Sequence, residues 1–163
     1  MGTVYEEVLP NVDIIGGVLD DTQFLTRPMA DPTATFKDGE WVVENSDGNV
    51  AKLSSGGAAD VPEPVRPRMV FGGTERHDVQ ESGSLTVLRG GYKAKTMIYQ
   101  TGESFTNGSK LICHWDGDYG ELGKIGSGDT FLVVGEVTKA PVTDGTDYLE
   151  FEAYATPYLV VVA

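Results

Sequence analysis

Short runs in which apolar and polar residues alternate, separated by glycine-rich turns, dominate the chain from residue 33 onward. In the run 147–154, for example, Leu149 and Phe151 share one side of an extended chain, and Glu150 lies on the other. Valine, threonine and tyrosine are frequent, and glycine reaches 21 residues, a mixture typical of strands joined by tight turns. No segment after residue 20 has a convincing helical face.

The strand pattern predicts an all-β domain, either a small β-barrel or a β-sandwich of about eight to ten short strands. Asp38-Gly39 is expected to turn a hairpin between 33–36 and 40–44, since Asp-Gly supplies the positive φ that such turns need. A second turn at 46–49 leads into the run 50–53, and a loop or linker is expected over 54–67. The later strands are expected over 68–71, 85–89, 92–100, 110–115, 122–125, 131–139, 147–154 and an apolar, buried final strand, 158–162.

The first 32 residues are rich in large apolar side chains but follow neither the helical nor the strand period. Pro10, the pair Gly16-Gly17, Pro28 and Pro32 interrupt every candidate element. Disordered tails are poor in such apolar residues, so we expect residues 1–32 to form an extended arm that lies on another molecule. The residues expected to contact that partner are Val12, Ile14, Ile15, Val18, Leu19, Phe24 and Leu25.

The predicted organisation is therefore an N-terminal arm, residues 1–32, followed by an all-β domain, residues 33–163. The hairpin over 33–53 can belong to either part.

Charge is high and unevenly distributed. The formal net charge of −13 argues against non-specific nucleic-acid binding, which needs lysine and arginine contacts to phosphate. Residues 84–115 nevertheless carry four basic residues and one acidic residue, a net of +3. These basic residues either dock an acidic neighbour or protect an exposed strand edge from aggregation, and we favour protection.

No catalytic or metal-binding constellation is evident. The single Cys113 lies in an apolar run and is expected to be a buried, hydrophobic thiol. The two histidines, His77 and His114, have no second histidine at ligand spacing. The cluster Asp116, Asp118 and Glu121 lacks the EF-hand spacing, so we interpret it as a solvated hairpin loop. We expect no enzymatic activity, no metal and no cofactor.

Two further features bear on function class. The aromatic residues, Trp41, Trp115 and the tyrosines among them, either fill the core or line a carbohydrate-binding face, and the core is the commoner outcome in β domains. The acidic start lacks the pattern of a signal peptide, and no run approaches the ~18 apolar residues of a membrane span. These features favour assembly in a cytoplasm, away from membranes.

Three features stand out in the segment 99–154: the stretch from Tyr99 through the Thr106-Asn107-Gly108 turn, the Gly120-Glu121-Leu122-Gly123 turn, and the strand Val133-Val134-Gly135-Glu136-Val137. In these features the segment resembles the small β-barrel decoration (cement) proteins of tailed-bacteriophage heads. The resemblance covers about a third of the chain and consists of turns and strands, with no catalytic residue to carry over.

The resemblance implies a non-enzymatic virion structural protein on the outer surface of an icosahedral phage capsid, assembled in the host cytoplasm. Such a protein stabilises contacts between subunits of the major capsid protein, its expected partner. Neighbouring copies of the chain are a second expected partner, as a homo-oligomer. The alternative function is a ligand-binding β module for carbohydrate or a host receptor.

Overall fold

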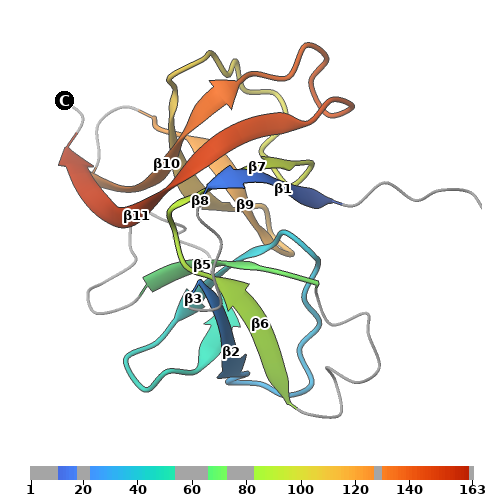
Figure 1. Cartoon of the computed structure of the whole chain (residues 1–163), viewed down its shortest axis with the longest axis vertical. Coiled ribbons are helices and arrows are strands. Elements are labelled where there is room, and N and C mark those ends of the chain that lie inside the picture. Colours follow the sequence, from blue (N-terminus) through green and yellow to red (C-terminus); the bar gives the residue numbers. More distant parts are fainter. Residues whose placement is uncertain (1–10, 18–22, 54–65, 73–82, 127–129, 162–163) are drawn as a thin grey trace, which may run out of the picture.

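The fold consists of two antiparallel β-sheets with no helix among the described residues (Figure 1). The computed structural model describes residues 11–17, 23–53, 66–72, 83–126 and 130–161. The strands are β1 Val12–Gly17, β2 Phe24–Pro28, β3 Trp41–Glu44, β4 Val50–Lys52, β5 Arg66–Val70, β6 Ser84–Leu88, β7 Tyr92–Thr96, β8 Lys110–Trp115, β9 Gly120–Lys124, β10 Thr130–Lys139 and β11 Leu149–Val161.

Sheet A has the strand order β1-β7-β11-β10-β8-β9, and sheet B the order β2-β6-β5-β3-β4. Both sheets curl, as two isolated parallel bridges among the described residues indicate: Tyr99 with Leu122 of β9 in sheet A, and Met29 with Val50 of β4 in sheet B. These bridges do not extend into ladders, so neither sheet is a closed barrel. The prediction of an all-β fold is confirmed, and of its two architectures the structure has the sandwich-like one.

Two core clusters explain the apolar pattern of the central strands. The larger cluster lies between sheet A and one face of sheet B, and includes Trp41, Met69 and Phe151. The smaller cluster lies on the opposite face of sheet B and includes Val42 and Val70. Since neighbouring residues in a strand face opposite sides, Trp41 and Val42 each enter a different core. Sheet B is therefore apolar on both faces.

The expected arm differs from the structure wherever its residues are described. β1 pairs with β7 at the end of sheet A, and β2 pairs with β6 at the end of sheet B. In β1 the even-numbered residues are the more buried and the odd-numbered residues the exposed ones, and the pairing with β7 is irregular between Ile14 and Gly16. The consecutive apolar Ile14 and Ile15, followed by two glycines, conceal this alternation in the sequence. Residues 12–17 and 24–28 thus belong to the body.

The first expected hairpin is also wrong. Residues 33–36 form no strand, and Phe36 instead packs into the smaller core cluster. β3 pairs with β4 across the turn at 45–49, which confirms the second expected turn. The two final strands expected over 147–154 and 158–162 are one strand, β11, whose pairing with β10 is irregular between Val133 and Gly135.

Candidate functional site

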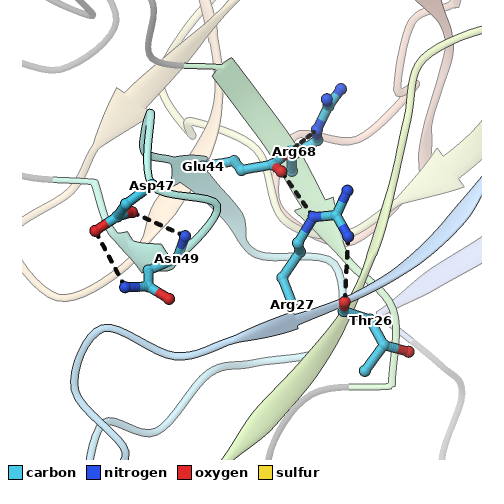
Figure 2. A network of polar contacts seen from close by, with 6 residues as sticks. All are labelled: Thr26, Arg27, Glu44, Asp47, Asn49 and Arg68. Carbon is cyan, nitrogen blue, oxygen red and sulfur yellow. Dashed lines mark hydrogen bonds and ion pairs between the residues drawn. The ribbon is translucent and has the colours of Figure 1, made fainter.

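A buried carboxylate joins three strands of sheet B (Figure 2). Glu44 Oε1 accepts a hydrogen bond from Arg27 Nε at 2.7 Å, and Glu44 Oε2 accepts one from Arg68 Nε at 2.8 Å. Burial alone would raise the pKa of Glu44, but the hydrogen bonds from Arg68 and Arg27 outweigh it and lower the pKa. Glu44 is therefore ionised at neutral pH, and the three groups carry a net charge of +1.

The position of this ion cluster indicates a structural role. Glu44 lies two residues from Val42, and Arg68 two residues from Val70, so both share the face of sheet B that carries the smaller core. β2 and β3 are not neighbours in the strand order, but the bridge between Met29 and Val50 brings the end of β2 to β4. The ion cluster therefore ties the two ends of the curled sheet together. The neighbouring β3–β4 turn is held by hydrogen bonds from Asn49 to Asp47 (Figure 2).

A second buried carboxylate lies at the start of β3. Glu40 is fully buried, its Oε1 accepts a hydrogen bond from Lys52 Nζ at 2.7 Å, and its Oε2 has no hydrogen-bond partner. Burial raises the pKa of Glu40, and the lysine offsets part of that effect. A small pocket that Glu40 does not line is formed by Trp41, Arg68 and Tyr154 among others and has room for about one water molecule. Its size suits an ordered water better than a substrate.

The acidic residues of the β8–β9 hairpin have structural partners. Asp116 Oδ1 accepts backbone hydrogen bonds from Asp118 and Tyr119, which closes the turn as the sequence predicts. Glu121 lies in β9, where it is buried with Oε1 2.9 Å from His114 Nδ1, so the expectation of a solvated loop is wrong for this residue. Among the described residues, no three acidic, histidine or cysteine side chains are grouped so as to hold a metal ion. His77 lies outside the described residues.

Cys113 is buried, as predicted, and burial raises the pKa of its thiol. A thiol that stays protonated is a weak nucleophile.

Two of the basic residues of the middle segment, Lys93 and Lys95, do not protect a strand edge. β7, which carries Lys93 and Lys95, lies between β1 and β11 in sheet A. Lys95 is in register with Asp13 on one side and Glu150 on the other, and Lys93 is in register with Glu152. Opposite charges on neighbouring strands stabilise a sheet modestly. The lysines of β7 therefore belong to a charge pattern across the outer face of sheet A, and the expected protection of a strand edge is wrong for them. Docking of an acidic neighbour stays a prediction.

The arm residues expected to contact a partner differ in their burial, and the described ones fall into three groups. Val12 is buried in the larger core cluster. Three others are partly buried and pack on the two clusters: Ile14, Phe24 and Leu25. Ile15 is 45% exposed, on the outward side of β1. Val18 and Leu19 lie outside the described residues. Of the described arm residues, Ile15 alone is offered to a partner as a largely exposed side chain.

The C-terminal part of β11 is exposed, which contradicts the expectation that this apolar strand is buried. Tyr158 is 41% and Leu159 is 59% exposed. The ring of Tyr158 stacks on that of Tyr154, with centroids 5.7 Å apart, and Lys110 Nζ donates a hydrogen bond to the Tyr154 hydroxyl at 2.8 Å. Sequence reasoning missed this surface because apolar composition shows that a strand can be buried but does not show what covers it.

Comparisons with protein-family models, with curated proteins and with solved structures find no match. No helix in the part of the chain that the structure describes is long and apolar enough to cross a membrane.

The described surface therefore offers two candidate contact sites, which we name by their strands. The β1 edge comprises Val12–Gly17 with the exposed Ile15. The β11 ribbon comprises Tyr158–Val161 together with its partner residues Thr130–Val133 of β10.

Proposed function

We propose that this chain is a non-enzymatic virion structural protein that decorates the outside of an icosahedral phage capsid and stabilises contacts between major capsid subunits. The observation that carries the proposal is the β1 edge: an outermost strand whose second side pairs with no described strand and which presents Ile15 to solvent. The resemblance of 99–154 to cement proteins supports the same function. That segment spans most of sheet A, the sheet that β1 ends.

An open strand edge binds a partner through main-chain hydrogen bonds, while exposed side chains such as Ile15 enter pockets that give specificity. A ligand that binds only the assembled shell stabilises the shell by mass action. Many copies on one lattice increase the effect, because each bridged pair of subunits is held at high effective concentration. A strand edge of this kind suits a capsid partner without requiring any catalytic group.

The test is co-sedimentation of the full chain with capsids purified from the virus that encodes it and stripped of this protein. We expect saturable binding, and we expect Ile15→Asp to abolish it, because the new carboxylate would be desolvated in the contact. Val142→Asp is the matched control, since Val142 is an exposed apolar residue (89%) in the loop after β10. Absence of the chain from purified particles by mass spectrometry, or full binding by the Ile15 variant, would refute the proposal.

A second function is favoured by one observation. The stacked pair Tyr154 and Tyr158 lies beside Lys110, whose Nζ is also 3.2 Å from Glu136 Oε2. An exposed tyrosine next to charged hydrogen-bonding groups is the arrangement that a carbohydrate-binding module would use. Glycan-array binding by the chain that is lost in Tyr158→Ala would favour this function. Trp115 is the less informative position, since its side chain packs on the larger core.

A further inference from the structure

We propose that the β11 ribbon pairs with the same ribbon of a second copy of this chain, through antiparallel contact between the two β11 strands. β7 pairs with β11 only from Leu149 to Ala153. Beyond that point β11 pairs with β10 alone, at Thr130–Val133. Among the described residues no strand occupies the outer edge of Tyr158–Val161, and Figure 1 shows this end of β11 at the margin of the molecule.

Both faces of the ribbon are accessible. Tyr158 and Leu159 are neighbours in a strand and so point to opposite faces, yet both are substantially exposed, at 41% and 59%. Exposed apolar strand edges are templates for pairing with another chain, and proteins that avoid such pairing place charges, prolines or bulges on the edge. Within 158–161 there is no charge and no proline; Pro157 stands just before the free edge.

Charge points to a second copy as the occupant. The chain has 12 basic and 25 acidic residues, so two copies repel each other over most of their surfaces. The last eleven residues, 153–163, form the longest run without a charged side chain, and 130–135 of the partner strand is also uncharged. Two copies can therefore approach each other at the ribbon without placing like charges in contact.

The geometry of an antiparallel strand pair supports the same occupant. Two identical strands paired antiparallel are related by a two-fold axis, so each surface is complementary to itself and no second binding surface is required. A basic partner of a different kind would be steered to acidic surface, which the ribbon does not provide. The stacking of Tyr158 on Tyr154 also fixes one of the contact side chains before association.

Sedimentation equilibrium of the full chain over a concentration series tests the proposal. We expect a reversible dimer that strengthens as salt is raised, because salt screens the repulsion between the acidic copies. Leu159→Lys should raise the dimer Kd by roughly tenfold or more, since the contact would bury two ammonium groups. Val142→Lys adds the same charge at an exposed apolar site in another place and should leave the dimer Kd unchanged.

Circular dichroism establishes whether each variant is folded. If Leu159→Lys does not fold, Leu159→Thr replaces it, because threonine keeps the strand propensity. A chain that is monomeric throughout the series, or a dimer that folded Leu159 variants do not weaken, would overturn the proposal. The proposed capsid function is tested independently of the dimer. Ile15→Asp should abolish capsid binding and leave the dimer intact.

Discussion

Lys52 holds one oxygen of Glu40 at 2.7 Å, while the other oxygen of that buried carboxylate has no hydrogen-bond partner. An unsatisfied polar atom in the interior costs free energy, and a charge increases that cost. The raised pKa of Glu40 expresses the same cost, because burial favours the protonated form. A carboxyl group whose pKa is higher in the folded state contributes stability below its unfolded pKa, near 4.5, and loses that contribution as pH rises through the folded pKa.

Replacement of the Glu40 carboxylate by an amide should remove the loss of folding stability that accompanies rising pH. We expect Glu40→Gln to be as stable as the natural chain or more stable at pH 7, and to lose this advantage below pH 4.5, where Glu40 is protonated. Thermal unfolding of both proteins between pH 4 and pH 8 measures the difference. Lys52→Met is the companion variant: it should destabilise the chain at pH 7, because it leaves the Glu40 charge without a partner.

Glu44 should show the opposite pH dependence. Its pKa is lowered in the folded state, so the stability it contributes is present above its unfolded pKa, near 4.5, and is lost as pH falls through the folded pKa. Glu44→Ala should cost about 3–5 kcal/mol in the free energy of unfolding at pH 7, because two arginines lose their shared acceptor. Urea denaturation measures this cost, and Glu103→Ala, which removes an exposed carboxylate from the loop between β7 and β8, is the control.

The double variant Glu44→Leu with Arg68→Met removes both charges of the buried Glu44–Arg68 pair. It should lose less free energy of unfolding than Glu44→Ala, which leaves the Arg68 charge buried without its partner. An unchanged free energy of unfolding in Glu44→Ala would contradict the structural role assigned to the cluster.

Glycine is required where the two sheets approach each other. A Cβ atom added to Gly120, the first residue of β9, would overlap the carbonyl oxygen of Trp41 in β3. We expect Gly120→Ala to destabilise the chain by about 1–3 kcal/mol, since a backbone oxygen cannot move without shifting sheet B. Gly16→Ala is the matched control, because its Cβ would lie 3.7 Å from the Lys93 side chain, an ordinary contact. Similar melting temperatures for the two variants would contradict this packing of β9 on β3.

The sequence patterns predicted β8 and β10 most accurately. The expected strand over 110–115 is β8 to the residue, and the strand expected over 131–139 is β10 less its first residue. The turn at 46–49 was found because Asp47 and Gly48 carry a local turn signal. These features depend on residues that are near each other in the chain, which is why a local pattern is enough to predict them.

Other features depend on contacts between distant segments and left no local signal. Arg68 meets Glu44 because β5 and β3 are paired neighbours, and Arg27 of β2 reaches Glu44 because sheet B curls. Nothing near any of the three residues in the sequence indicates the other two. The β11 ribbon has the composition of a core strand, and its exposure follows from the absence of a covering strand among the described residues. The sequence therefore predicted Ile15 as one of several apolar residues that contact a partner. It did not indicate that Val12, another of these residues, lies in the core.

The first strands provide the sharpest disagreement between sequence and structure. An arm that lies on another molecule can be removed without unfolding the body, whereas β1 and β2 are integral to the two sheets. Deletion of residues 2–31 would expose the edges of β7 and β6 and would remove Val12 and Met29 from the two core clusters. We expect this deletion to abolish cooperative unfolding, measured by circular dichroism during heating. Deletion of residues 2–10 is the control, since it leaves both strands in place and should retain a cooperative transition. If the protein that lacks residues 2–31 still unfolds cooperatively, β1 and β2 contribute little to the fold. That result would support the N-terminal arm that the sequence predicts.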